Sequence, residues 1–423
     1  MSNTFDFIAM VGLGYIGLPT AAMFASRKKM VLGIDINQHA VDTINNGQTH
    51  IIEPELDMIV GAAVQQGYLK ASTTPQPADA FLIAVPTPFR GDHEPDVTYV
   101  EAAARSIAPV LKKGDLVILE STSPVGTTER LATWLAEVRP DLKFPVGPDD
   151  VADVNIAYCP ERVLPGKVIH ELVVNDRIIG GITRSCSARA IALYKIFVEG
   201  ECIETDSRTA EMCKLTENSF RDVNIAFANE LSLICDKLGI NVWELISLAN
   251  RHPRVNILRP GPGVGGHCIA VDPWFIVHSA PEQARIIRSA REVNDSKPHW
   301  VVDKVNAEIT KYLCAHDGWT ASDVTVACFG LAFKPDIDDL RESPAVDIAA
   351  AIGKAHPGQV IAVEPNISAL PPASMHGVEL CGTDDAIAAA HVVVMLVPHK
   401  AFREVPSNLF DGKAIVDACG FFA

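Results

Sequence analysis

The sequence predicts an α/β protein with two Rossmann-like, doubly wound domains, joined by a long central helix and a helical dimerisation region. Apolar strands alternate with helix-length segments up to about residue 200 and again after about residue 317. Strands separated by helix-length segments imply βαβ units and parallel sheets. The region between them lacks this alternation. We therefore expect three domains, over residues 1–200, 201–316 and 317–423.

The first domain contains six apolar runs that predict strands, at residues 7–11, 31–34, 80–85, 116–120, 155–158 and 177–180. Polar or turn residues follow several of them, including Pro86, Thr87 and the run Ser121-Thr122-Ser123-Pro124. Ligands of doubly wound sheets bind outside the carboxyl ends of the strands. We therefore expect these residues to border a binding site.

The central region begins with a segment, residues 201–238, that contains neither glycine nor proline. Its apolar residues recur at steps of three and four, as on one face of a long helix: Phe220, Val223, Phe227, Leu231, Ile234 and Leu238. Gly239 is a plausible helix stop. A helix of this length predicts a link between domains and a surface for a homodimer or higher homo-oligomer.

The last domain has four expected strands, at residues 324–329, 360–363, 392–397 and 414–416. They predict a second doubly wound sheet. This part of the sequence has no GxGxxG motif, so we expect it to bind something other than the ligand of the first domain.

Charge and cysteine content exclude several classes of partner. The net charge of −16 comes without a basic block, which argues against nucleic acid and anionic membranes as partners. The ten cysteines show no zinc-ligand spacing, so no metal is expected. No signal peptide and no membrane-spanning run is apparent. These features together predict a cytoplasmic protein.

A dinucleotide fingerprint opens the chain: Gly12-Leu13-Gly14-Tyr15-Ile16-Gly17. Gly12 allows the tight turn, Gly14 lets the backbone approach a pyrophosphate, and Gly17 lets helix and strand pack closely. The motif follows an apolar strand and begins a helix at 18–26. The second strand is followed by Asp35, 23 residues after Gly12. An acid there accepts a ribose 2′-hydroxyl and repels a 2′-phosphate, so we expect NAD as the cofactor.

A glycine-rich run near the middle of the chain, Gly261-Pro262-Gly263-Val264-Gly265-Gly266, leads to His267 and Cys268. The glycines and prolines bring backbone N–H groups close to whatever the thiol of Cys268 attacks. A thiol can hold an aldehyde covalently, so a chain with NAD and this thiol could carry an alcohol past the aldehyde to the acid. The alternative is a small buried hydrophobe. His267 is expected to pack beside the thiol rather than act as its base.

Four further polar residues are candidates for catalysis. Lys214 and Asn218 are four apart on the long helix and so share a face, where they would stabilise an oxyanion. The alternative for Lys214 is a salt bridge to Glu211 or Glu217. Glu161 follows a strand and is a candidate general base or a solvated loop acid. Asp272 could orient a base or a water, or simply begin a turn before Pro273.

At these residues the chain resembles the UDP-glucose/GDP-mannose dehydrogenase family. The matching motifs run in order over essentially the whole chain: residues 12–17, Ser121 to Thr127, Pro160-Glu161, Lys214 with Asn218, Gly265 to Cys268 with Asp272, Phe333-Lys334-Pro335 and Arg341-Glu342-Ser343. The resemblance implies an N-terminal NAD domain, a central dimerisation region and a C-terminal UDP-sugar-binding domain. This division agrees with the one drawn from the strand pattern.

The resemblance also implies roles for individual residues. Cys268 is the nucleophile, Lys214 and Asn218 stabilise the oxyanion, Asp272 and Thr122 organise water and proton transfer, and Glu161 acts in thioester hydrolysis. The expected substrate contacts are Glu161, Arg162, Val163, Lys214, Asn218, Arg254, Asn256, Arg259, Gly265, Phe333 and Lys334. The expected NAD contacts are Gly12, Gly14, Tyr15, Ile16, Gly17, Asp35, Pro86, Thr87, Thr122 and Arg341.

Within the family, Gly-Gly-His-Cys-Ile followed by Val271-Asp272-Pro273 resembles the branch that oxidises N-acetylated sugars. The nearest resemblance implies UDP-N-acetyl-D-mannosamine as the substrate, for a surface polysaccharide of the enterobacterial common antigen type. One departure is that the UDP-glucose enzymes carry arginine sixteen positions before the nucleophile, where this chain has His252. Arg254 or Arg259 is the expected replacement.

Other functions fit parts of the pattern. The same chemistry could act on UDP-N-acetylglucosamine or UDP-glucose. A two-electron hydroxyacid dehydrogenase of the 6-phosphogluconate type shares the Rossmann domain and long helix but needs no thiol. A scaffold or NAD sensor would keep the fold without turnover. The number of NADH molecules released per substrate molecule distinguishes these functions, because only the thiol mechanism yields two.

Overall fold

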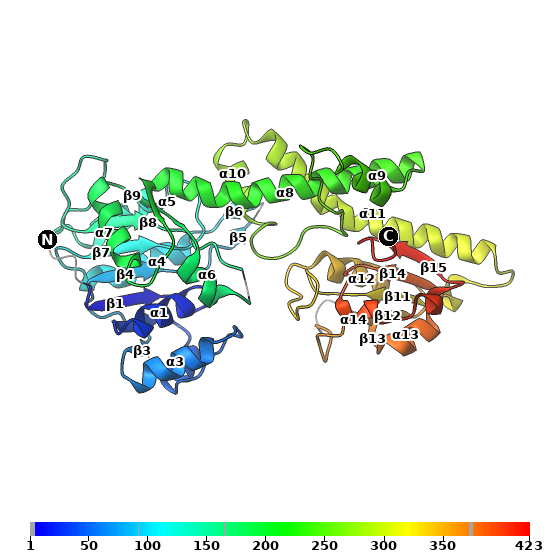
Figure 1. The fold of residues 1–423 in the computed structure, drawn as a ribbon, viewed down its shortest axis with the longest axis horizontal. Helices are drawn as coiled ribbons and strands as arrows, with labels where there is room; N and C mark the ends of the chain where they lie inside the picture. Colours follow the sequence, from blue (N-terminus) through cyan, green and yellow to red (C-terminus); the bar gives the residue numbers. More distant parts are fainter. Residues whose placement is uncertain (1–4, 92, 165, 372–374) are drawn as a thin grey trace. The chain divides into compact units, whose positions relative to one another are not determined.

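The computed structural model describes residues 5–91, 93–164, 166–371 and 375–423. The chain forms two compact units, Met1–Glu217 and Asn218–Ala423, and the division falls inside the long helix α8 (Ser207–Leu238; Figure 1). Within the described ranges, no helix combines the length and the apolar character that crossing a membrane requires.

The first unit is built on an eight-stranded sheet with the order β10-β9-β8-β7-β4-β1-β2-β3. The strands are β1 (Phe7–Val11), β2 (Met30–Ile34), β3 (Leu69–Ser72), β4 (Ala80–Ile83), β7 (Leu116–Leu119), β8 (Asn155–Tyr158), β9 (Arg177–Gly181) and β10 (Cys202–Asp206). All six expected strands are present. The short strand β3 and the edge strand β10 were not expected, and β10 belongs to this sheet although it lies beyond residue 200, where the sequence placed the domain boundary.

One pair of strands departs from the expected parallel sheet, because β8 and β9 are antiparallel. The segment between them, which holds α6 (Val168–Val174), therefore starts and ends at the same edge of the sheet. That edge is the carboxyl end of β8. The loop with Glu161, Arg162 and Val163 consequently stays at the edge where ligands of such sheets bind.

Helices cover both faces of this sheet, which makes the unit doubly wound (Figure 1). One core contains Phe24, Ile44, Val60 and Leu193, and the other contains Val100 and Leu131. The helices are α1 (Gly17–Ser26), α2 (Gln38–Asn45), α3 (Leu56–Gln65), α4 (Thr98–Ile107), α5 (Thr127–Val138), α6 and α7 (Arg184–Tyr194). A small hairpin, β5 (Phe89–Arg90) and β6 (Glu94–Pro95), follows the fourth strand.

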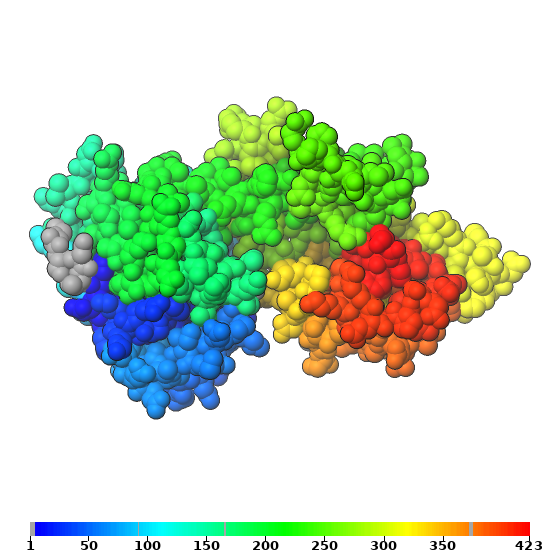
Figure 2. Space-filling view, viewed as in Figure 1, coloured from blue at the N-terminus to red at the C-terminus, as the bar shows by residue number. Residues whose placement is uncertain are grey.

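The second unit combines helices with a five-stranded parallel sheet of order β13-β12-β11-β14-β15. Its helices are α9 (Val242–Ala249), α10 (Asp272–Ser279), α11 (Arg285–Cys314), α12 (Pro344–Ala355), α13 (Thr383–Ala389) and α14 (Lys400–Arg403). Its strands are β11 (Val326–Phe329), β12 (Val360–Val363), β13 (Glu379–Leu380), β14 (Val392–Met395) and β15 (Ala414–Asp417). The four expected strands are present, and only the two-residue β13 was not expected. Figure 2 shows the last residues of the chain, in red, at the surface beside the bright green segment that holds α9.

The long helices α8 and α11 pack through polar side chains. The buried Asp222 carboxylate accepts hydrogen bonds from Arg291 (2.6 Å) and from Asn294 (2.8 Å). Asn229 in turn donates to Asn294 at 2.8 Å. Because this polar face is turned inward, much of the apolar stripe predicted from the sequence is exposed, including Phe220 at 69% and Phe227 at 51%.

Candidate active site

The turn after β1 has the backbone that a dinucleotide needs. Gly12 has φ +90°, and a Cβ there would lie 2.4 Å from the Ala84 carbonyl oxygen. A Cβ on Gly17 would lie 1.8 Å from the Gly12 oxygen, so this position must also be glycine. Gly14 has nothing within 4 Å of its Cβ position, which leaves open space where a pyrophosphate would approach. Helix α1 begins at Gly17 directly behind the turn.

The acid after β2 is held in place by backbone donors. One oxygen of Asp35 accepts from the N–H of Leu13 at 2.9 Å, and the other accepts from the N–H of Asn37 at 2.9 Å. The carboxylate is half-buried and remains accessible to a ribose hydroxyl. Tyr15 is exposed, and Ile16 lies at the N-terminal cap of α1. The residues present therefore fit NAD.

The loops after β4 and β7 are tied together at the same edge of the sheet. The Thr87 hydroxyl donates to the Thr122 carbonyl at 2.7 Å. Ser121 accepts from the Val85 N–H at 2.9 Å and donates to the Val85 carbonyl at 2.7 Å. Pro86 lies exposed between these contacts. The structure thus brings the candidates of both loops next to each other.

Glu161 is a buried member of a charged cluster, not a solvated loop acid. Its carboxylate lies 2.9 Å from a guanidinium nitrogen of Arg177 and accepts from the Arg162 N–H at 2.8 Å. Close by, the Tyr194 hydroxyl donates to Glu120 at 2.5 Å. Burial, together with the charge of Glu161, raises the pKa of Glu120 to about 7.

The salt bridge considered for Lys214 is absent among the residues that the structure describes. Both glutamates that could pair with Lys214 have other partners. Glu211 accepts from the N–H groups of Gly126 (2.6 Å) and Thr128 (2.8 Å) at the start of α5, and Glu217 pairs with Arg162 at 2.8 Å. Lys214 is half-buried on α8, one helical turn from Asn218.

Cys268 is exposed in the turn that enters α10. Its carbonyl accepts from the N–H groups of Val271 (3.1 Å) and Asp272 (2.9 Å), which fixes the turn. The exposed thiol is not the buried hydrophobe considered as the alternative. His267 is exposed as well.

Asn218 and Asp272 form a buried pair next to this turn. The Asn218 amide donates to the Asp272 carboxylate at 2.5 Å, and the two residues are only 7% and 2% exposed. This bond uses one of the two N–H groups of the amide and leaves the other for a substrate oxygen. Asp272 is therefore not a simple turn acid, since it orients Asn218.

The glycines before Cys268 are required by close packing against a second segment of the same unit. A Cβ on Gly265 would lie 2.2 Å from the Glu342 carbonyl oxygen, and one on Gly266 would lie 3.2 Å from the Phe333 ring. At the other end of the loop, the Gly261 N–H donates to Asn229 of α8 at 2.9 Å. The structure thus brings the cysteine loop together with the segment that holds Phe333 and Lys334.

The remaining candidates differ in their surroundings. Arg254 and Asn256 are exposed. Arg259 packs over the Trp243 ring at 5.3 Å and donates to the Gly420 carbonyl at 3.1 Å, so Arg254 is the better placed of the two arginines for a ligand. Arg341 forms a two-point pair with Asp339 at 2.9 and 2.7 Å.

The sequence did not point to Arg177, Glu120 or Tyr194. Each lies in an apolar run or directly after one, and no motif marks them. Their strands and helix are far apart in sequence and come together only in the folded sheet. A charged residue inside a buried strand, as Arg177 is, was the one signal that could have been noticed.

Family models cover most of the chain. Residues 6–198 match the NAD-binding domain of the UDP-glucose/GDP-mannose dehydrogenase family, residues 208–296 match its central domain, and residues 327–423 match its UDP-binding domain.

Individual proteins match over the full length. The chain is 67% identical over 417 residues to the UDP-N-acetyl-D-mannosamine dehydrogenase of Salmonella typhi, covering 99% of each chain. It is 61% identical over 419 residues to the NDP-N-acetyl-D-galactosaminuronic acid dehydrogenase of Ralstonia nicotianae, covering 99% of this chain and 97% of that one. The solved structure of UDP-D-ManNAc dehydrogenase from Pyrococcus horikoshii superimposes with a TM-score of 0.86 and 38% identity, covering 98% of this chain and 96% of that one. The chain therefore belongs to the UDP-glucose/GDP-mannose dehydrogenase family.

Proposed function

We propose that this chain oxidises the C6 alcohol of UDP-N-acetyl-D-mannosamine to the carboxylic acid, with two NAD reduced for each sugar consumed. The observation that carries this proposal is the exposed thiol of Cys268 beside the buried Asn218–Asp272 pair. The sugar is proposed from the names of the relatives that the chain resembles at 67% identity.

The cofactor site lies at the carboxyl ends of β1, β2, β4 and β7. Gly12, Gly14, Gly17 and Asp35 would hold NAD, with Tyr15, Ile16, Pro86, Thr87 and Thr122 around it. NAD, when bound, accepts a hydride from the substrate carbon. We assign Arg341 to the same cofactor.

Cys268 performs the covalent step. Its sulfur adds to the aldehyde carbon, and the carbonyl oxygen takes up a proton to give a thiohemiacetal. Loss of a hydride and a proton from this adduct leaves a thioester. Water then adds to the thioester carbon, the carbon–sulfur bond breaks, and the acid and the thiol are released. The covalent bond prevents the aldehyde from escaping between the two oxidations.

Asn218 and Lys214 stabilise the negative charge that develops on the substrate oxygen. The Asn218 amide is fixed by its hydrogen bond to Asp272, which uses one of its two N–H groups. Lys214 offers an ammonium group that no carboxylate among the described residues neutralises. Such preorganised donors are worth several kcal/mol each in a desolvated site, on the order of 3–4 kcal/mol.

Glu161 is the proposed base that takes a proton from the attacking water, and Thr122 helps to orient that water. Arg177 fixes the Glu161 carboxylate by the 2.9 Å ion pair. The proposed sugar and nucleotide contacts are Arg162, Val163, Arg254, Asn256, Arg259, Gly265, Phe333 and Lys334.

The test is to count NADH against sugar consumed. The purified protein is incubated with excess NAD and, separately, UDP-N-acetylmannosamine, UDP-N-acetylglucosamine, UDP-glucose or GDP-mannose. Two NADH from UDP-N-acetylmannosamine support the proposal. One NADH with accumulating aldehyde contradicts the role of Cys268, and two from another sugar contradict the substrate.

A second substrate class is favoured by one comparison. The relative named for N-acetyl-D-galactosaminuronic acid is 61% identical to this chain. UDP-N-acetylgalactosamine is therefore added to the same assay. Both sugars present an N-acetyl group, so the chemistry at Cys268 would be unchanged.

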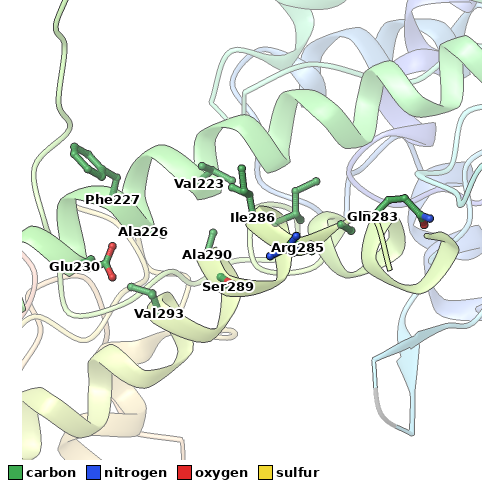
Figure 3. Close-up of a pocket in the computed structure, with 12 residues that line it drawn as sticks. Val223, Ala226, Phe227, Glu230, Gln283, Arg285, Ile286, Ser289, Ala290 and Val293 are labelled. Carbon is green, nitrogen blue, oxygen red and sulfur yellow. The ribbon is translucent and has the colours of Figure 1, made fainter. Parts of the chain in front are cut away.

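We also propose that the protein forms a homodimer through α8 and α11. A groove of about 980 Å³ runs between them and is lined by Val223, Ala226 and Phe227 of α8 and by Ile286, Ala290 and Val293 of α11 (Figure 3). Phe220, Phe227 and Ile234 repeat every seven residues on α8 and are each at least 47% exposed, so a second copy of this helix would cover them. Sedimentation of Phe227→Asp as a monomer would support this; an unchanged dimer would contradict it.

A cytoplasmic location and a role in surface polysaccharide synthesis remain predictions.

A further inference from the structure

The turn after β11 repeats the backbone of the dinucleotide turn after β1. Gly330 has φ +86° and its N–H donates to the Val363 carbonyl at 2.8 Å, as the N–H of Gly12 (φ +90°) donates to the Ile34 carbonyl at 2.8 Å. The following N–H, of Leu331, donates to the acid that ends the next strand at 2.8 Å. Both sheets therefore build the same turn at the point where strand order reverses.

The acid in the second sheet, Glu364, is fully engaged by the protein. One oxygen accepts from the N–H groups of Leu331 (2.8 Å) and Ala332 (3.1 Å) and lies 2.9 Å from His399 Nε2. The other accepts from the N–H (3.1 Å) and the side-chain amide (2.9 Å) of Asn366. The whole residue is only 4% exposed. Glu364 therefore fixes the turn after β11, and neither of its oxygens remains available to a ribose hydroxyl.

His399 connects Glu364 to the loop that contains Asp336. The ring is fully buried, and its Nδ1 accepts from the Asp336 N–H at 2.9 Å. Since the backbone N–H can only donate, Nδ1 carries no proton, and Nε2–H donates to Glu364. The hydrogen bonds from His399 and from the Leu331 N–H lower the pKa of Glu364 against the opposing effect of burial. The two contacts of the ring thus assign the acceptor role to Nδ1 and the donor role to Nε2.

The residue that His399 holds is in an unfavourable conformation. Asp336 has φ +63°, which side-chain-bearing residues rarely adopt. Besides the bond from its N–H to His399, its carboxylate accepts from the Lys400 N–H at 2.9 Å. Asp336 follows Phe333 and Lys334 in the loop of residues 331–343. His399 and Lys400 thus fix the loop that carries two proposed nucleotide contacts.

We propose that His399 is a positioning residue for the nucleotide-binding loop of residues 331–343, and that loss of the acceptor at its Nδ1 releases this loop and weakens nucleotide-sugar binding. The inference rests on the proposed function, in which Phe333 and Lys334 contact the substrate. A donor in place of the Nδ1 acceptor would face the Asp336 N–H, so two donors would meet and the bond would be lost.

The groups around His399 hold the ring in this orientation. Glu364 from the end of β12 faces Nε2, the Asp336 carboxylate lies 4.0 Å from Nδ1, and Lys400 of α14 pairs with Asp336 at 3.4 Å. The Asn366 amide (3.2 Å from Nδ1) and the edge-on Phe402 ring are uncharged.

Two isosteric variants separate the two ring nitrogens. His399→Asn places an amide oxygen where Nδ1 lies, so it keeps the acceptor. His399→Gln places an amide nitrogen where Nε2 lies, so it keeps the bond to Glu364 and loses the acceptor. The dissociation constant of UDP-N-acetylmannosamine is measured calorimetrically for the parent and both variants at one pH, without NAD, so that no turnover occurs.

We expect His399→Asn to bind UDP-N-acetylmannosamine as the parent does, because it keeps an acceptor for the Asp336 N–H. His399→Gln should bind about tenfold more weakly, because an unsatisfied N–H lowers the population of the binding-competent loop. Binding by His399→Asn that is as weak as that of His399→Gln, or parent-like binding by His399→Gln, overturns the inference.

A measurement without any nucleotide distinguishes this inference from the proposed function. Amide hydrogen exchange of residues 331–343 should be faster in His399→Gln than in the parent at one pH, and unchanged in His399→Asn. Exchange that is equal in all three proteins overturns the positioning role, whatever the substrate. If the loop responds as expected but no nucleotide sugar binds to the parent, the proposed function fails instead. Unchanged NAD binding by each variant shows that the other domain is intact.

Discussion

Replacing Gly265 by alanine tests whether the packing of the glycine loop sets the position of the catalytic thiol. The new Cβ would lie 2.2 Å from the Glu342 carbonyl oxygen and 2.7 Å from Pro344 Cδ. Carbon and oxygen that are not bonded keep a separation of more than 3 Å, so the loop must move by about 1 Å. The obstacle is mainly backbone, which cannot turn aside as a flexible side chain could.

This displacement is passed to Cys268, three residues further along a short loop. A misplacement of about 1 Å in a reacting group costs on the order of 100-fold in rate. We therefore expect Gly265→Ala to lower kcat/KM for the nucleotide sugar by about 100-fold. The assay is the initial rate of NADH formation with saturating NAD, after thermal unfolding has shown that the variant is folded.

Gly261→Ala is the matched control, because it makes the same change at the start of the same loop. A Cβ there has its nearest neighbour, the Gly263 oxygen, at 3.8 Å, an ordinary contact. We expect kcat/KM within about threefold of the parent. If folded Gly265→Ala were as active as Gly261→Ala, the close contact with Glu342 would not position the thiol and the reasoning would be refuted.

Three further predictions concern single side chains. Cys268→Ser should stall before the acid, because an oxygen ester forms and hydrolyses poorly; acid formation at the parent rate, measured by chromatography, would exclude the covalent mechanism. Lys214→Ala should lower kcat by about 100-fold or more with little change in KM, whereas a change in KM alone would make Lys214 a binding residue. Burial lowers the pKa of Lys297 from 10.5 to about 7. Between about pH 7 and 10.5 the unfolded chain therefore binds more protons than the folded one. The free energy of unfolding of the second unit, Asn218–Ala423, should rise with pH across this range. This rise should be smaller in Lys297→Met, and equal slopes in urea titrations of the two proteins would contradict it.

Most of the fold could be predicted because its signals are local. Each of the ten expected strands is an apolar run of a few residues, and each is present. The missed strands lack such a run. Strand β10 is an edge strand that reads Cys-Ile-Glu-Thr-Asp, and its two acids face the solvent rather than a core. The antiparallel pairing of β9 was missed because direction depends on where the chain returns to the sheet, which the composition of the strand does not show.

The candidate site could be predicted to the extent that it consists of motifs. Gly12, Gly17 and Gly265 are marked in the sequence because each lies where a Cβ would collide with backbone, and glycine clusters are visible without a structure. The pair of Asn218 and Asp272 is different. Both residues were candidates, but the hydrogen bond that joins α8 to α10 spans 54 positions and has no local signal.

The residues that support the site were the hardest to find, and the reason is physical. Arg177, Glu120, Glu364 and His399 are buried charged or polar groups, each only 0–4% exposed, and each pairs there with a group from another segment of the chain. A buried polar group without such partners costs several kcal/mol, so the fold must supply them. The sequence shows the groups but not their partners. A short sequence pattern shows the thiol and its glycines, and the structure shows the contacts that fix their positions. Variants such as Gly265→Ala and His399→Gln therefore test these contacts and not the chemical step itself.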